Sequence, residues 1–167
     1  MEIKGYISTL DKNTGDVLQL LKECSEEQFE HKDGEAWSIL EILEHLLIID
    51  RAVHRILLKR DRQQAETPEL AGSEKIKRFM SHREYKIASP EAAKPKGEIK
   101  NESQFVQAFL KQRGLLIDDL EKGNIVLDNG IVAHAVIGDM TKRDWLSFLV
   151  SHAERHLEQI KEVLEKF

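Results

Sequence analysis

The chain has 167 residues, of which 41% are hydrophobic and 33% charged, a mixture typical of a folded globular protein rather than a disordered one. Its 30 acidic residues outnumber its 25 Lys and Arg residues, and the net charge of -5 argues against a general nucleic-acid binder. The single cysteine, Cys24, excludes an internal disulfide and a multi-cysteine zinc site, and we interpret it as an apolar filler or an idle thiol. We expect one domain over residues 1–167.

The start of the chain lacks the basic and apolar pattern of a secretory signal. No stretch approaches the roughly 18 consecutive apolar residues that cross a membrane. The expectation is a cytoplasmic protein with no membrane partner.

The first predicted helix begins near Ile3 and continues to Leu21, because apolar residues recur there at close to the 3.6-residue period of a helix. The stretch "SEEQ" at residues 25–28 predicts a short further turn, in which Ser25 caps and Gln28 reaches back to it.

The second helix begins at Ser38, whose side chain can cap the helix together with Glu41 three residues later, and it should continue to about Arg60. His45 shares an apolar stripe with Ile42 and Ile49 and should therefore face the core. His54 lies off this stripe, so we expect it on the surface.

A long connector follows, from about residue 61 to residue 102. It contains all three prolines and one predicted short helix in "SEKIKRFM". Its length allows the chain to return from one end of a helix bundle to the other, so that the second and third long helices run parallel. A basic run at residues 75–86 includes Phe79 and Tyr85, but a solvated helix face explains it better than a nucleic-acid site in an acidic protein.

The third long helix should begin near Asn101 or Ser103 and end before Lys122. Its predicted inward side carries Val106, Phe109, Leu110, Ile117 and Leu120. We interpret the apolar stretch "IVLDNGIVAHAVIG" at residues 125–138 as a loop, although its Asn-Gly pair and β-branched residues would also allow brief strand pairing.

The last helix opens with the capping pair Thr141 and Asp144. Its inward stripe is expected to contain Trp145, Leu149, His152, His156, Ile160 and Val163. Four amphipathic helices without convincing strands predict an all-α four-helix bundle.

Histidines four residues apart lie on the same side of a helix, so His152 and His156 can share one metal ion. His45 is the other histidine on a core-facing stripe and supplies a third nitrogen. Three histidines with an open position are typical of a catalytic ion. The alternative is three hydrogen-bonded core histidines, but burial of three uncompensated imidazoles is costly.

The other histidines are weaker candidates. His31 and His82 should be solvent-exposed, whereas His134 either approaches the mouth of the site or packs within its loop. Arg155 would meet an anionic substrate or pair with a surface acid.

Three carboxylates lie near His45 in the sequence. Glu41, Glu44 and Asp50 would either orient a ligand and move protons, or serve as capping and solvated groups.

These residues resemble the DinB/YfiT-like family in three places: "WSILEILEHL" at residues 37–46, His134 with Gly138, and "DWLSFLVSHAERHLEQI" at residues 144–160. The resemblance covers essentially the whole chain. It implies an up-down-down-up four-helix bundle with a long connector between the second and third long helices, and commonly a homodimer. It also implies a divalent metal, often zinc or nickel, bound by His45, His152 and His156.

In the family that this chain resembles, some members transfer a low-molecular-weight thiol such as bacillithiol, glutathione or mycothiol, and others are thiol-dependent isomerases. The expected function is therefore a metal-dependent enzyme that transfers such a thiol to an electrophilic small molecule. The alternatives are a metal-dependent hydrolase that uses a bound water, and a non-catalytic bundle stabilised by its ion. This chain has Ala135 and Ile137 where relatives often have Pro and an aromatic residue, so the resemblance carries no substrate role over to His134.

Overall fold

The structure is a computed structural model that describes residues 1–60, 62–84 and 87–167. Within these residues the elements are α1 (Ile3–Leu21), α2 (Glu26–Glu30), α3 (Ile39–Leu58), α4 (Ser73–Ser81), the 3-10 turn η1 (Glu91–Ala93), α5 (Glu102–Glu121), β1 (Val132–His134), β2 (Gly138–Met140) and α6 (Lys142–Lys166). The prediction of a mostly helical protein is confirmed, with one small antiparallel hairpin added.

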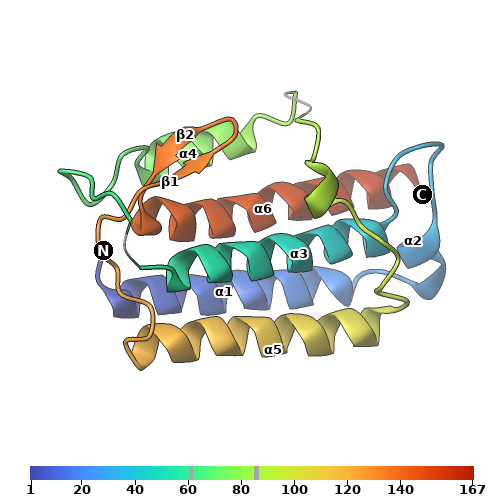
Figure 1. Cartoon of the computed structure of the whole chain (residues 1–167). Helices are drawn as coiled ribbons and strands as arrows, with labels where there is room; N and C mark the ends of the chain where they lie inside the picture. The colour runs from blue at the N-terminus through green and yellow to red at the C-terminus, as the bar shows by residue number, and fades with distance from the viewer. Residues whose placement is uncertain (61, 85–86) are drawn as a thin grey trace.

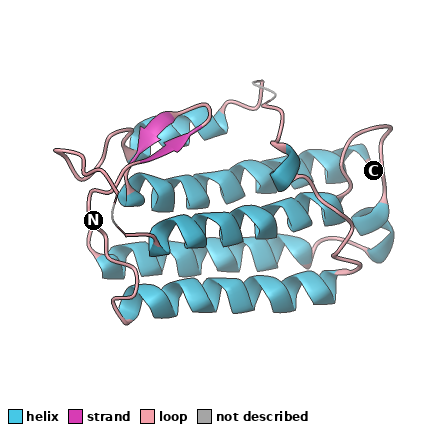
Figure 2. Ribbon diagram, in the orientation of Figure 1, coloured by secondary structure: helices cyan, strands magenta, loops and turns pink. Residues whose placement is uncertain are grey.

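The four long helices α1, α3, α5 and α6 lie side by side (Figure 1). Helix α3 contacts α5 and α6, and α1 contacts the same two helices. Helices α1 and α6 run toward the end of the molecule where the C-terminus lies, whereas α3 and α5 run away from it (Figure 1). The hairpin and α4 lie together outside the long helices, against the first half of α6 (Figure 2).

Side-chain caps fix the starts of α3 and α6 where the sequence predicts them. Ser38 Oγ accepts a hydrogen bond from the Glu41 backbone N–H at 3.2 Å, and the Glu41 carboxylate accepts from the Ser38 N–H at 2.7 Å. Thr141 and Asp144 form the same reciprocal box at α6. These starts matter because they set which residues of α3 and α6 face each other.

The core consists of two apolar clusters separated by buried polar groups. The first cluster contains Val17, Leu20, Leu21, Phe29, Ile39, Leu40, Ile42, Leu43, Leu46, Leu47, Phe105, Phe109, Ala153, Leu157 and Ile160. The second contains Tyr6, Leu10, Val53, Leu57, Ile76, Met80, Leu116, Leu120, Ile125, Met140, Trp145, Leu146, Phe148 and Leu149. Between the two sets along the helices lie the buried residues Asn13 of α1, Asp50 of α3 and Arg113 of α5.

The predicted inward side of α5 is partly wrong. Leu110 is 45% exposed, whereas Gln112 and Arg113 are buried. The expectation that His54 lies on the surface is also wrong, because its Nε2 lies 2.8 Å from Asp119 Oδ2 and its Nδ1 lies 3.0 Å from Gln112 Nε2. Hydrogen bonds to polar partners on a neighbouring helix offset the free-energy cost of burying these side chains. Hydrophobic periodicity does not detect such pairs.

The stretch predicted as a loop contains the hairpin instead. Val132 pairs with Met140 and His134 with Gly138, so the turn falls at residues 135–137 rather than at the Asn-Gly pair. Gly138 has φ +92°, a conformation that favours glycine. The Asn-Gly pair meets the connector, where Gly130 forms an isolated bridge with Gln64.

No helix of the described residues is both long and apolar enough to span a bilayer. The short helix expected in the connector is confirmed as α4. Tyr85 and Lys86, part of the basic run, lie outside the described residues.

Candidate metal centre

Three buried histidines converge between α3 and α6. His45 projects from α3, and His152 and His156 project from consecutive turns of α6. The Nε2 atom of His152 lies 3.1 Å from that of His45 and 3.2 Å from that of His156. One nitrogen from each ring lies within 4.8 Å of the other two. Two ligands of a tetrahedral zinc ion, each at about 2.0–2.1 Å from it, are about 3.4 Å apart, so these separations fit one shared ion.

The outward ring nitrogens have hydrogen-bond partners that determine what the inward nitrogens can do. His45 Nδ1 lies 2.7 Å from the carbonyl oxygen of Ala93, and His156 Nδ1 lies 2.7 Å from Gln159 Oε1. Because an oxygen of either kind only accepts, both Nδ1 atoms carry the proton and donate it. In the neutral rings both Nε2 atoms are then lone-pair acceptors. His152 Nε2 can donate to one of them but not to both, so a cation is the partner that satisfies all three.

The protonation states suit metal binding. Burial lowers the pKa of His45, and it lowers the pKa of His156 to about 3. Burial, together with the nearby rings of His156 and His45, lowers the pKa of His152 well below its ordinary value. All three rings are therefore neutral near pH 7, the form in which histidine binds metals.

A cavity of about 320 Å³ adjoins the three histidines. Its wall comes from α3, the end of α4, the segment at residues 87–90, the hairpin and α6. Besides the three histidines, the lining residues are Ile49, Ala52, Val53, Ile56, Met80, Ile87, Ala88, Ser89, Pro90, Ala133, His134, Ala135, Val136, Trp145, Phe148 and Arg155. Most of these are apolar, so the cavity suits a small molecule with a largely apolar body.

The charged lining of this cavity is sparse. Among the described residues, no Asp or Glu lines it. Arg155 contributes a cation at its edge, where one guanidinium nitrogen donates to the backbone oxygens of Met80 at 2.8 Å and of His82 at 2.9 Å. Away from the three histidines, the described part of the cavity wall therefore offers no carboxylate to pair with an organic cation.

His134 lies in this wall, and of its two expected positions the structure shows both at once. Its Nδ1 accepts hydrogen bonds from the backbone N–H groups of Val136 and Ile137, each at 3.1 Å. Its ring lies 4.9 Å from that of Phe148, which in turn stacks on His152 at 5.3 Å. His134 thus packs within its own turn and also borders the cavity.

The candidate carboxylates do not line the cavity. Glu41 caps α3 and pairs with Lys32. Glu44 is buried and accepts hydrogen bonds from the connector, and Asp50 is buried against Arg113, so neither is the solvated group that was one of the expectations.

The remaining candidates have no role at this centre. His31 and His82 are exposed, as predicted. Cys24 packs against the first cluster, and burial raises its pKa to about 11, so the thiol is protonated near pH 7.

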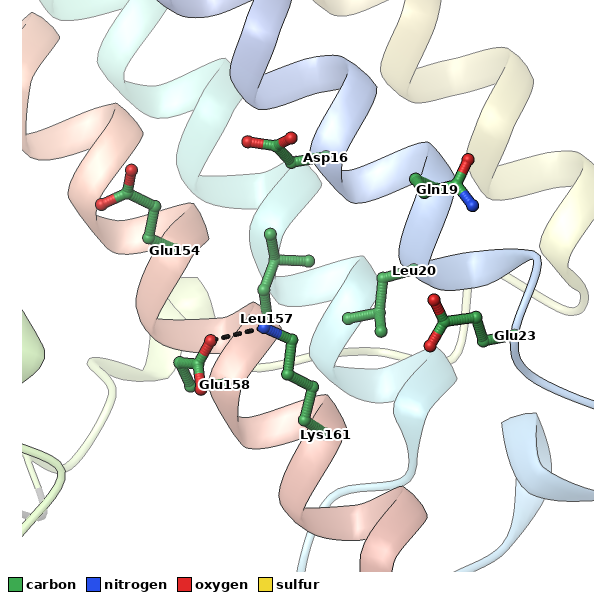
Figure 3. A pocket seen from close by; sticks show the side chains of 8 residues that line it. All are labelled: Asp16, Gln19, Leu20, Glu23, Glu154, Leu157, Glu158 and Lys161. Carbon is green, nitrogen blue, oxygen red and sulfur yellow. Dashed lines mark hydrogen bonds and ion pairs between the residues drawn. The ribbon is translucent and has the colours of Figure 1, made fainter.

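A second hollow lies between α1 and α6 (Figure 3). Asp16, Glu23, Glu154 and Glu158 give it an acidic lining, and Glu158 pairs with Lys161 at 2.7 Å. None of the three histidines lines it. Within the part of the chain that the structure describes, the histidine cluster is the group whose ligand atoms lie close enough together for one ion.

Sequence periodicity identifies the histidines and, on the same helix stripes, Ile49 and Trp145, but it does not identify the parts of the cavity wall that lie off those stripes. Phe148 and the hairpin residues 133–136 reach the cavity through the turn after β1 and the packing of α6, and no local pattern marks them. The capping box at Thr141 is the sequence feature that bears on the position of Phe148, because it fixes the residue at which α6 begins.

Comparison with known proteins places these residues in a family context. The sequence profile of the DinB superfamily matches residues 9–160. The chain is also similar to the uncharacterized protein YuaE of Bacillus subtilis (strain 168), with 29% identity over 150 residues that cover 87% of this chain and 89% of the relative. No solved structure matches the chain significantly.

Proposed function

The chain belongs to the DinB superfamily, and on that premise we propose that it is a metal-dependent enzyme whose divalent ion is bound by His45, His152 and His156. We propose zinc or nickel as the ion, because both accept imidazole nitrogen as a ligand. In the same proposal α1, α3, α5 and α6 form an up-down-down-up bundle, which the helix directions in Figure 1 support.

The observation that carries the proposal is the convergence of the three Nε2 atoms. His45 and His156 each use the Nδ1 proton for a hydrogen bond, so the Nε2 atom of each ring carries a lone pair and no proton. Both of these Nε2 atoms lie close to His152 Nε2. His152 can donate an Nε2 proton to only one of these two lone pairs, so the other is left buried without a partner unless a cation lies among the three nitrogens. Three protein ligands also leave a coordination position for a substrate.

We propose that the reaction is transfer of a low-molecular-weight thiol to an electrophilic small molecule. A divalent ion at this position supplies Lewis acidity that lowers the pKa of a thiol and so favours the nucleophilic thiolate near pH 7. In the transfer a sulfur–carbon bond forms, the bond to the leaving group breaks, and the thiol proton leaves with that group. The cavity wall contributes by holding the apolar body of the electrophile and excluding water.

Metal analysis of the full chain, purified without an affinity tag, tests the site. We expect about one equivalent of divalent metal in the native protein after reconstitution at neutral pH, and less than about a tenth of an equivalent in His152→Ala, because two imidazoles do not hold an ion as tightly as three. His31→Ala, which removes an exposed histidine, is the matched control and should keep its metal. A native protein that binds no divalent ion would contradict the proposal.

The type of reaction is tested separately with the metal-loaded protein. Turnover of electrophiles that requires an added thiol supports transfer, whereas turnover without thiol indicates the hydrolase alternative. A non-catalytic ion predicts instead that His152→Ala loses thermal stability together with the metal, with no turnover in any assay.

A further inference from the structure

The ring of His134 is fixed by its own hairpin. His134 is the last residue of β1, and its Nδ1 accepts from the N–H groups of Val136 and Ile137 in the turn that follows. A ring nitrogen that accepts two hydrogen bonds carries no proton, so in the neutral ring the proton is on Nε2. Burial lowers the pKa of His134, which favours this neutral ring near pH 7. The turn therefore selects the tautomer with an Nε2–H donor.

The Nε2–H group has no hydrogen-bond partner among the described residues, although the ring is half-buried and lines the cavity. Two aromatic rings hold the imidazole in place, Trp145 at 5.6 Å and Phe148 at 4.9 Å between ring centroids. Trp145 is itself fixed, because its Nε1 donates to the Val132 oxygen at 3.1 Å. A donor that is held rigidly and lacks a protein partner is available to a ligand.

The rest of the cavity limits what that ligand is. The wall is mostly aliphatic and aromatic, and among the described residues no carboxylate lines it. Such a lining favours a neutral or anionic molecule with an apolar body over a cation. The His134 ring contacts Phe148, and Phe148 stacks on His152 of the histidine cluster. A molecule that accepts the hydrogen bond of His134 therefore also lies near the three histidines.

We propose that His134 donates a hydrogen bond from Nε2 to an acceptor oxygen on the substrate, and that the substrate is a small, largely apolar electrophile carrying such an oxygen, for example a carbonyl or epoxide. This proposal deepens the proposed function and rests on it where it treats the bound molecule as a substrate. The binding site itself rests only on the cavity. When the thiol sulfur bonds to the neighbouring carbon, the π bond of the carbonyl or the carbon–oxygen bond of the epoxide breaks and its electron pair moves to the oxygen, which finally takes the thiol proton. The His134 donor stabilises the negative charge that develops on this oxygen.

Two substitutions distinguish the proposed donor role of His134 from a purely structural role in which the residue only closes the turn. In His134→Asn the short amide places its oxygen where Nδ1 was, so the turn keeps an acceptor while the Nε2 donor is lost. In His134→Gln the longer amide extends toward the position of Nε2 and keeps a donor there. A structural role predicts that Asn is the milder change, whereas a donor role predicts that Gln is.

The experiment uses the full chain with added zinc and two uncharged probes of similar shape, acetophenone, which has a carbonyl oxygen, and ethylbenzene, which has none. The dissociation constants give a preference ratio, the Kd of ethylbenzene divided by that of acetophenone. We expect His134→Asn to lower this ratio about 3- to 10-fold, the size of one lost hydrogen bond, and His134→Gln to retain a higher ratio than His134→Asn. Long-range proton–nitrogen NMR of the native protein should show the proton of His134 on Nε2, and acetophenone should shift its signal.

A proton on Nδ1, no binding of acetophenone, a ratio in His134→Asn within about twofold of the native ratio, or equal losses in both variants would each overturn the proposal. Zinc content is measured on the same samples and should be the same in all three proteins. Failure of zinc to bind would count against the proposed function alone, because the probes bind the cavity wall and need no ion.

Discussion

Arg113 is the largest fully buried side chain of the described residues, and its contacts tie three helices together. Its guanidinium pairs with the carboxylate of Asp50 on α3 and donates to Asn13 Oδ1 on α1 at 3.1 Å. It also lies 4.7 Å from the centre of the Phe109 ring. Its hydrogen bonds from α5 go to Asp50 on α3 and to Asn13 and Thr14 on α1, so the residue specifies how α1, α3 and α5 are placed relative to one another.

Loss of one partner should destabilise the protein strongly. Asp50→Asn leaves the Arg113 charge buried without a counter-ion, and we expect it to lower the free energy of unfolding by about 3–5 kcal/mol. Chemical denaturation with urea measures the change. Asp16→Asn is the control, since it breaks an exposed ion pair with Lys12 and should lower the free energy of unfolding far less than Asp50→Asn does.

A double variant distinguishes an ionic requirement from a packing requirement. Asp50→Leu combined with Arg113→Met replaces both charges by apolar groups, and it should be more stable than Asp50→Asn alone because no uncompensated charge remains. Equal losses in Asp50→Asn and in the exposed-pair control would contradict a buried, coupled pair.

For single residues, the sequence predicts which side chains face the core when the periodicity of their own helix decides this. His45, His152 and His156 lie on apolar stripes, and the structure brings them together. Arg113 and His54 could not be predicted, because each is buried by a partner about 60 residues away in the chain, as the pairs Arg113–Asp50 and His54–Asp119 show. No local period records a contact of that kind.

Among the elements, the connector between α3 and α5 contributes directly to the candidate centre. Two neighbouring residues of α3 hold it. Glu44 accepts hydrogen bonds from the backbone N–H groups of Lys96 at 2.6 Å and Ile99 at 3.3 Å, and His45 Nδ1 donates to Ala93 at 2.7 Å. The connector thus supports the His45 ring, and Glu44 supports the connector.

Removing the charge of Glu44 should weaken metal binding without removing a ligand. Glu44→Gln keeps the length of the side chain, but its amide cannot accept both backbone hydrogen bonds as strongly, so the segment that orients His45 loosens. We expect the metal Kd to rise about 10-fold and the Lys96 and Ile99 amides to exchange hydrogen faster. Isothermal titration with zinc and hydrogen-exchange mass spectrometry measure the two effects.

Glu98→Gln provides the control for this element, since Glu98 is an exposed carboxylate of the same connector. It should leave the Kd and the exchange rates unchanged. Faster exchange in Glu44→Gln with an unchanged Kd would mean that the connector does not position His45.

Elements with strong caps could be predicted from sequence, and the hairpin could not. Ser38 and Thr141 mark the starts of α3 and α6 through local hydrogen bonds that the residue types themselves indicate. The strands β1 and β2 have three residues each, too short for an alternating pattern to be visible. Their turn is held by His134 rather than by the usual turn residues.

For the whole molecule, the relation between the two apolar clusters decides whether residues 1–167 unfold as one unit. Helices α3, α5 and α6 each contribute side chains to both clusters, and so does α1. The polar groups between the clusters are hydrogen-bonded across helices, as Arg113 and Asp50 show. Neither cluster can therefore lose its helices while the other keeps them, which predicts cooperative unfolding.

The two tryptophans allow a direct test, because Trp37 packs against the first cluster and Trp145 belongs to the second. Variants Trp37→Phe and Trp145→Phe each leave one fluorescent reporter, and both retain an aromatic ring at the changed site. We expect the fluorescence midpoint in urea to equal the midpoint of far-ultraviolet circular dichroism within each variant. If fluorescence and circular dichroism diverge, with the Trp37 reporter and the Trp145 reporter deviating in opposite directions, the two clusters unfold separately and the chain is not a single cooperative domain.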